Sequence, residues 1–572
     1  MNRQQLILAR IGTDFDPRTQ VPLGPWCFLG KEGVYADWEK LPFFDVFDDA
    51  ETQWAHWLQV RKLANHLVRR LATELNTRHG TNYGLRYWRE LLLLWLLLLI
   101  QTSWVRYLHI KAFIEKWPGK PLAVELIDHR DWDFASELDF FTNGSKNPIF
   151  DAWVCSLVIE RLAPKDWSLT QVAAAEILYK EPGGEDRIPA RTNALKRYLR
   201  RVLGRQRFFH VTGTGPVASV LMSTFLSLLP CKPAHLPELI DGDDFDPCQA
   251  FPNDYLEILE TLIPATLPRT FRDDFAAHDE AAKKQGYRAG KLMVTAAAKY
   301  LSANRFMTAQ AIQAGERILR AQHGAGYGWS RTQNAQEIEY FDQAFLSWGW
   351  EKDGVHPDKA VPLPSPMLSR FKDGHRERTS NLIFVGTNLE MGPFPFKAAP
   401  QPTKWLTYRR WKVAFLNSLG SEVMSQLLYR PYFRTPSDLE DVGYLEKHLP
   451  PLPLLKDDLT QAMLGCRLLV LDHPGTALNI AMAANVPLVG VWEQKAWPLH
   501  PEAQPAFDRL REAKILFHDP MEAAAHINAV WADVSSWWNA ADVREAHRDW
   551  SRQFALADKI WWWPWLRKLA TL

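Results

Sequence analysis

Two glycine-rich loops carry the residues best suited to chemistry. The first is QHGAGYG, residues 322–328, in which His323 ends a predicted strand and three glycines follow. Histidine has an ordinary pKa of about 6.5, so it can accept a hydroxyl proton near neutral pH. Glycine lets backbone approach a ligand closely. We expect His323 to be a general base, the alternative being a structural histidine. The expected cleft-loop residues are Gln322, Gly324, Gly326, Tyr327 and Gly328.

The second loop follows the predicted strand RLLVLD and has the sequence HPGTALN, residues 473–479. Gly475 and Thr476 open a predicted helix, whose free N–H groups suit a diphosphate. The alternative is an ordinary strand-to-helix turn with Thr476 as its cap. Arg430, at the end of another strand, has the donor geometry to bind phosphate, although such an arginine is often only solvated. The expected donor-binding residues are Thr387, Asn388, Arg430, Asp472, His473, Pro474, Gly475, Thr476 and Asn479.

Regular alternation of strands and helices places these donor residues at one edge of a sheet. Apolar strands alternating with helices predict a parallel, doubly wound sheet, which binds ligands outside the carboxyl ends of its strands. The predicted strands are 381–387, 425–430, 467–472, 486–492 and 513–517. The predicted helices are 405–419, 458–464, 475–485, 502–512 and 521–534.

The first half of the chain is predicted to be rich in helix. Residues 54–79 and 86–114 have the apolar spacing of two helices, and 207–211 and 318–322 resemble strands. The run LLLLWLLLLI, residues 91–100, is too short to cross about 30 Å of hydrocarbon, so we expect a helix buried in protein. A turn with two glycines follows the first strand, and Pro216 suits the first position of the next helix.

These elements suggest two domains and a returning C-terminus. We expect an N-terminal, helix-rich α/β domain on the acceptor side (1–350) and a proline-rich linker (351–378). A Rossmann-like donor domain (379–535) follows, and helices at 536–572 are expected to pack back on the N-terminal domain.

Composition and charge limit the partners that the protein can bind. A formal charge of +1 gives the protein no overall electrostatic field that would attract nucleic acid, so we expect no nucleic-acid partner. The five cysteines are scattered, and no zinc spacing or leader-peptide pattern is present, so we expect a cytoplasmic protein without metal or other cofactor. The acidic run DGDDFD (241–246) lacks the rest of a metal-binding motif and is expected to be a surface loop. The 26 tryptophans suit packing, sugar stacking or a membrane interface.

Several segments together resemble a bacterial family of transferases linked to surface-carbohydrate biosynthesis. They are LGPWC (23–27), the stretch 75–108, QHGAGYG (322–328), FDQAFLSWGW (341–350), LDHPGTALNIAMAANVPLVGVW (471–492) and REAHRDWSRQFA (544–555). Ala325 stands where the resemblance leads us to expect Gly, and LLLLW stands where Gly-Pro-Trp is expected. The order of the two glycine-rich loops is also similar to that of GT-B glycosyltransferases. That similarity implies two Rossmann-like domains, with His323 as base and 472–476 as the cradle for the donor phosphates.

The resulting hypothesis is a metal-independent glycosyltransferase of GT-B type. A nucleotide-sugar is the expected donor, and a surface polysaccharide or lipid-linked glycan is the expected acceptor. Peripheral contact with the inner membrane is a further expectation. The alternatives are a transferase of polyol phosphate and a non-catalytic, glycan-binding assembly factor.

Overall fold

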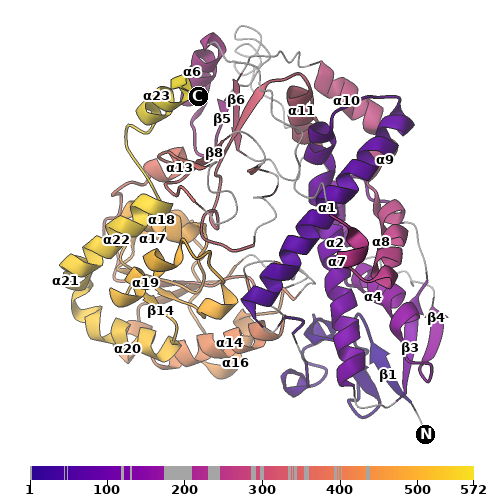
Figure 1. Ribbon diagram of the computed structural model, residues 1–572. Coiled ribbons are helices and arrows are strands. Elements are labelled where there is room, and N and C mark those ends of the chain that lie inside the picture. The colour runs from indigo at the N-terminus through magenta and orange to yellow at the C-terminus, as the bar shows by residue number, and fades with distance from the viewer. Residues whose placement is uncertain are drawn as a thin grey trace.

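Three parallel β-sheets organise the part of the chain that the structure, a computed structural model, describes. Figure 1 shows the N-terminal part on the right as a bundle around two long helices, the C-terminal part at the lower left, and the second sheet above the C-terminal part. The described residues are 3–43, 45–47, 49–117, 121–128, 132–172, 209–229, 245–284, 292–296, 302–332, 337, 339–340, 344–352, 360–391, 396, 399–400, 402–432 and 438–571.

The third sheet has the strand order β11-β10-β12-β13-β14, and all its pairings are parallel. Its strands are β10 (Leu382–Val385), β11 (Leu427–Arg430), β12 (Leu468–Leu471), β13 (Leu488–Val491) and β14 (Leu516–Phe517). Its helices are α14 (Pro402–Asn417), α15 (Ser421–Met424), α16 (Val442–His448), α17 (Leu459–Gly465), α18 (Thr476–Ala484), α19 (Gln504–Glu512) and α20 (Pro520–Val530). The predicted parallel sheet is confirmed. The strand order reverses between β10 and β12, where doubly wound sheets bind ligands.

The second sheet keeps the chain order, β5-β6-β7-β8-β9. Its strands are β5 (Phe209–His210), β6 (Leu292–Ala296), β7 (Arg317–Ala321), β8 (Phe345–Ser347) and β9 (Ala360–Pro362). Helices α6 (Pro216–Leu228) and α11 (Ser302–Gln313) accompany it. The strands predicted near 207–211 and 318–322 are confirmed. The segment 351–378, expected as a linker, contains β9 and the short helix α13 (Pro366–Ser369). A three-residue edge strand that ends in proline leaves no periodic signal.

A first sheet, with the order β2-β1-β3-β4, lies near the N-terminus and was not predicted. Its strands are β1 (Gln4–Ile7), β2 (Gln20–Pro22), β3 (Leu122–Ile127) and β4 (Ser168–Val172). Strands β1 and β2 are mostly half-buried and β4 is mostly exposed, and β1 and β4 contain glutamines, so their apolar pattern is weak. Other helices of this region are α3 (Glu137–Asp139), α4 (Pro148–Leu162), α7 (Pro247–Ala250), α8 (Asn253–Thr266), α9 (Arg269–Arg272) and α10 (Phe275–Lys283).

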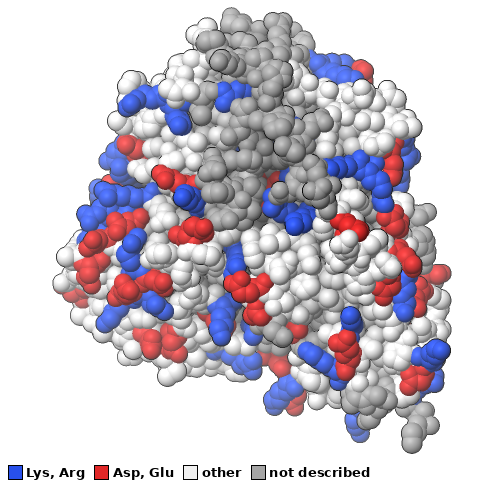
Figure 2. All heavy atoms as spheres, viewed as in Figure 1, with Lys and Arg blue, Asp and Glu red and all other residues white. Residues whose placement is uncertain are grey.

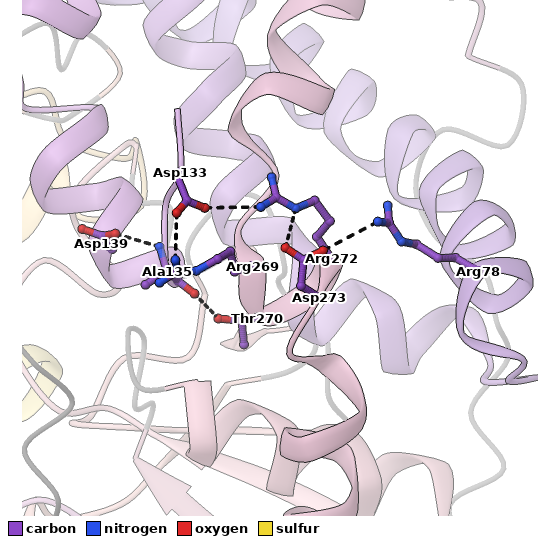
Figure 3. Close-up of polar contacts among 8 residues, drawn as sticks. All are labelled: Arg78, Asp133, Ala135, Asp139, Arg269, Thr270, Arg272 and Asp273. Atoms are coloured by element: carbon purple, nitrogen blue, oxygen red, sulfur yellow. Dashed lines mark hydrogen bonds and ion pairs between the residues drawn. The ribbon is translucent and has the colours of Figure 1, made fainter. Parts of the chain in front are cut away.

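An ion network on the surface joins three parts of the N-terminal region (Figure 3). Asp133 accepts from Arg269 at 2.7 Å and from Arg272 at 3.3 Å. Arg272 also pairs with Asp273, which lies 3.7 Å from Arg78 at the end of α1 (Ala50–His79). These side chains are substantially exposed, so they orient the elements more than they stabilise them.

Helix α2 (Leu85–Lys116) is the core of the N-terminal region and packs against α1 (Ala50–His79), α4, α8 and α11. All ten residues of the LLLLWLLLLI run are buried. The helix is long and apolar enough to cross a membrane, but 94% of its most apolar window is buried inside the protein. The prediction of a buried helix is therefore confirmed.

Buried ion pairs connect α2 with its neighbours. Arg106 lies 2.5 Å from Asp151 of α4, and Glu90 lies 2.6 Å from Arg320 of β7. The second pair matters for the site because β7 ends immediately before Gln322 and His323. Helix α2 thereby braces the strand that presents the first glycine-rich loop.

Glu137 is a buried carboxyl with a measurable effect on stability. Burial raises its pKa to about 8, although Arg305, 3.2 Å away, acts in the opposite direction. Glu137 therefore stabilises the fold below its ordinary pKa of 4.5, and this contribution is lost as the pH rises through about 8. We expect the free energy of unfolding of the wild type to fall by about 2 kcal/mol between pH 5 and 7 relative to Glu137→Gln. Urea unfolding at several pH values tests this, and parallel curves for the two proteins would contradict it.

The C-terminal helices return across the molecule. Helix α22 (Ala541–Phe554) packs against α18 and α19, beyond α21 (Val534–Trp538). After α22 the chain hydrogen-bonds to the second-sheet region, where the Leu556 N–H donates to the Trp348 carbonyl at 2.9 Å. Trp565 and Leu569 of α23 (Trp562–Thr571) then join the buried cluster of the second sheet.

Candidate functional site

The two glycine-rich loops meet where the second and third sheets face each other. The Ala325 N–H donates to the Thr476 hydroxyl at 3.2 Å, and a Cβ added to Gly324 would lie 3.7 Å from the same oxygen. Beyond the first loop, the Arg331 N–H donates to the Pro498 carbonyl at 3.1 Å. Ala325 and Thr476 are 151 positions apart in the sequence. The fold therefore brings two distant loops into direct contact.

His323 is held by two neighbours and retains access to solvent. Its Nδ1 lies 3.0 Å from the Tyr327 hydroxyl and 3.9 Å from a carboxylate oxygen of Glu339. The His323 side chain is 27% exposed, whereas the Glu339 side chain is fully buried. The Tyr327 hydroxyl is in hydrogen-bond contact with Nδ1, whereas the Glu339 carboxylate is near but beyond hydrogen-bond distance. With Nδ1 engaged in this way, the other ring nitrogen is the one suited to act as a general base.

Gln322 supports this loop from within. Its Oε1 accepts hydrogen bonds from the Trp348 N–H and the Trp350 indole, each at 2.9 Å. Its Nε2 donates to the Gly324 carbonyl at 2.9 Å. Gln322 is buried, so it shapes the loop and does not offer its amide to a ligand.

Two of the loop glycines are required by conformation. Gly326 and Gly328 have φ values of +89° and +78°, in the region that favours glycine. A Cβ at Gly328 would lie 2.4 Å from the Trp350 ring.

We expect Gly328→Ala to destabilise the protein by roughly 1–3 kcal/mol or more, because backbone strain adds to the ring overlap. Gly324→Ala is the matched control in the same loop, since its Cβ would make only an ordinary contact. Thermal melting of both variants tests this. Equal melting temperatures would show that the Gly328 conformation is not needed.

The sheet edge predicted to bind the donor includes the start of α18. Gly475 is the N-cap of this nine-residue helix, and Thr476 is its first residue. A Cβ on Gly475 would lie 2.5 Å from the His473 Nε2, so glycine lets the imidazole fold over the loop. Pro474 is buried. The free N–H groups at this helix start can bind an anion.

A buried lysine that the sequence analysis missed anchors this loop. Lys412 of α14 lies 3.2 Å from Asp472 and 2.9 Å from Asp441, and it contacts the Tyr429 hydroxyl at 3.2 Å. Tyr429 also donates to Asp441. Lys412 and Asp472 are both buried, so this cluster holds the end of β12 against α14.

The charges of the cluster support one another. Burial acts to lower the pKa of Lys412, but the carboxylates of Asp441 and Asp472 outweigh it and raise that pKa well above its ordinary value. Burial acts to raise the pKa of Asp472, but Lys412 and then His473 hold it below its ordinary value. Asp472 is thus an ionised internal anchor, and His473, whose Nδ1 lies 2.9 Å from it, is the more accessible member of the pair.

The other predicted donor residues have different surroundings. Thr387 lies just after β10, and its backbone N–H donates to the carboxylate of Asp472, which follows β12. Thr387 is therefore next to the loop that precedes α18. The Asn388 amide lies 3.4 Å from Asp438. Arg430 ends β11 and donates to the Leu455 carbonyl at 2.9 Å, with β10 between its strand and β12. Asn479 is buried and donates to the Phe554 carbonyl at 2.8 Å, so its amide fixes α22.

Sequence reasoning missed Lys412 and Glu339 for different reasons. Lys412 lies on the buried stripe of α14 with Trp405, Tyr408, Phe415 and Leu416, and a cation at such a position signals a buried partner. Glu339 has no comparable local signal, because its approach to His323 depends on how the loop folds.

Among the described residues, no group of three or more His, Cys, Asp or Glu side chains is arranged so that it could hold a metal ion. Most of the DGDDFD run, residues 241–244, lies outside the described residues.

Comparison with known proteins places the chain in a family. The model of the LIC12162 family transferases matches residues 4–569, almost the whole length. The protein belongs to the LIC12162 family of transferases. No curated protein matches this LIC12162 family transferase. Among solved structures, the spinosyn forosaminyltransferase SpnP matches with 13% identity and a TM-score of 0.29, over 52% of this chain and 79% of that chain. Structural similarity at this level carries no argument about the site.

Proposed function

We propose that this LIC12162 family transferase is a glycosyltransferase of GT-B type that uses a nucleotide-activated sugar. The observation that carries the proposal is the meeting of the two loops through Ala325 and Thr476. It brings a candidate base, His323, to the helix start that suits a diphosphate. A cleft between domains is a favoured ligand site, and the strand order of the third sheet puts its switch point at the same edge.

In the proposed reaction, His323 accepts the proton of the acceptor hydroxyl through its Nε2. The acceptor oxygen forms a bond to the anomeric carbon of the sugar as the bond from that carbon to the diphosphate oxygen breaks. The leaving diphosphate gains negative charge, which the N–H groups at the start of α18 stabilise. His473 and the Thr476 hydroxyl are the side chains at this edge best placed to donate to phosphate oxygens.

Electrostatic support for the diphosphate comes from the protein itself. The charges of Lys412 and Asp472 are paired internally, so Lys412 acts by fixing the loop and not by binding phosphate. The helix start therefore carries most of the proposed phosphate binding, without a metal in the proposed mechanism. We propose a surface polysaccharide or lipid-linked glycan as acceptor, on the N-terminal side, in the cytoplasm.

A thermal-shift panel of nucleoside diphosphates tests whether the protein binds a nucleotide-activated donor. A nucleoside diphosphate at 100 times its Kd should stabilise the protein by about 2.7 kcal/mol, which appears as a raised melting temperature. A screen that compares nucleotide sugars with nucleotide-activated polyols then separates sugar transfer from transfer of a polyol phosphate. Stabilisation by none of the nucleoside diphosphates would count against the proposal and favour a glycan-binding protein.

A further inference from the structure

Exposed apolar residues gather on two helices that pack against the second sheet. Ten large hydrophobic residues are notably exposed among the described residues, and six of them lie on α6 or around the start of α23. The six are Val217, Leu221, Leu228, Ile560, Trp562 and Trp563. We refer to them as the α6/α23 face. Helices α6 and α23 lie near each other at the upper left of Figure 1. Both contribute to one buried cluster, through Met222, Leu226, Trp565 and Leu569.

Helix α6 is apolar on both sides. Its sequence, PVASVLMSTFLSL, contains no charged residue. Met222 and Leu226 are buried, whereas Val217, Leu221 and Leu228 are 65–78% exposed. The exposed positions follow the spacing i, i+4 and i+11, which is one stripe of a helix. Hydroxyl residues are the only polar side chains of this helix, and large exposed apolar side chains on one stripe of an uncharged helix are typical of an interaction surface.

Helix α23 adds the features of a membrane-interface helix. Trp565 and Leu569 face the protein, and Trp562 and Trp563 before them are 46% and 50% exposed. Tryptophan favours the interface between lipid and water because its ring is apolar and its indole N–H is polar. Residues 559–572 contain three basic side chains, Lys559, Arg567 and Lys568, and no acidic one. Figure 2 shows white and blue atoms over this region at the upper left.

From this combination we propose that the α6/α23 face docks on an anionic lipid bilayer. Apolar side chains would enter the interface, and the basic residues would lie against the anionic headgroups. A protein partner with a purely apolar surface would leave Lys559 and Arg567 without a role, whereas anionic lipid satisfies both features. The buried α2 helix takes no part. This inference concerns lipid binding alone and does not rest on the proposed transfer reaction.

Vesicle flotation tests the proposal with the full chain and without any substrate. We expect binding to phosphatidylglycerol-containing vesicles and little binding to pure phosphatidylcholine. Trp562→Ser/Trp563→Ser should weaken binding about tenfold or more, because both rings lose their apolar contact with the interface. Met521→Ser removes an equally exposed apolar side chain on α20 and should leave binding unchanged. Unchanged melting temperatures would show that all variants fold.

A second pair of variants tests the electrostatic part. Lys559→Gln/Arg567→Gln should weaken binding to anionic vesicles about tenfold, and high salt should remove the difference. Lys447→Gln, on α16, is the matched exposed control. Three results would overturn the proposal. The first is no binding of the wild type to anionic vesicles, and the second is equal binding by the wild type and the double tryptophan variant. The third is a dimer in light scattering that the tryptophan substitutions dissociate, since a second copy would then cover the face.

Discussion

Replacement of His323 by Ala is expected to lower kcat by about 10²–10⁴-fold, the usual contribution of a general base. The donor is the one identified by the nucleotide-sugar screen. Because His323 lies on the second-sheet side, nucleotide binding at α18 should be nearly unchanged. The side chain is partly exposed, so the melting temperature should change little. Steady-state kinetics together with nucleotide-dependent thermal shifts measure both effects.

Two further variants make this test specific. His448→Ala removes an exposed histidine outside the site and should keep the wild-type rate. Glu339→Gln leaves His323 in place but removes the carboxylate 3.9 Å from its Nδ1. Since a nearby carboxylate favours the protonated imidazole, its loss should let His323 act as a base at lower pH, so we expect the acidic limb of the rate profile to shift to lower pH. Wild-type turnover by His323→Ala would exclude the base role, and an unshifted profile for Glu339→Gln would exclude its positioning role.

Replacement of Lys412 by Met is expected to destabilise the protein by about 3–5 kcal/mol, the usual effect of removing one partner from a buried ion pair. Methionine has a similar length, so the main loss is the positive charge. Asp441 and Asp472 would then lose the cation that they share, and only the Tyr429 hydroxyl and His473 would remain as their partners. Urea unfolding measures the loss. The loop that starts at Asp472 should also move. The rise in melting temperature caused by a nucleoside diphosphate should therefore be smaller in this variant than in the wild type.

Lys404→Met provides a control on the same helix. Lys404 is 51% exposed and lies 4.0 Å from its carboxylate partner, so its loss should change the free energy of unfolding by about 0–1 kcal/mol. A Lys412→Met variant as stable as Lys404→Met would show that the buried cluster does not anchor the loop. Asp441→Asn combined with Lys412→Met should recover part of the lost stability, because one uncompensated carboxylate is removed.

Much of the third sheet could be predicted from sequence because its local signals agree. Strands such as LIFV and LLVL are continuously apolar and fully buried, and each is followed by a helix with a clear start. The burial of residues 91–100 was likewise predicted, from the shortness of the apolar run. The whole helix α2 is long and apolar enough to cross a membrane, so its packing against neighbouring helices shows the burial more directly than its length does. The first sheet escaped prediction because its strands are short and its edges polar. Strand β9 escaped because pairing with β8, and not its own sequence, makes it a strand.

The two loops of the candidate site could be predicted from the sequence, but the contact between them could not. The types and spacing in QHGAGYG and HPGTALN indicated a base and an anion site, and the fold brings Ala325 to Thr476. The roles of Asn479 and Gln322 could not be predicted, because both amides are used by distant backbone or ring groups. Lys412 became recognisable only once Asp472 and Asp441 were seen on either side of it.

A crystal structure of the protein with a bound nucleoside diphosphate tests the proposed donor site most directly. We expect the diphosphate to lie at the start of α18, in hydrogen-bond contact with the N–H groups of Thr476 and its neighbours, with His323 on the facing loop. A nucleotide bound to the second sheet, or anywhere away from the 472–476 loop, would contradict it.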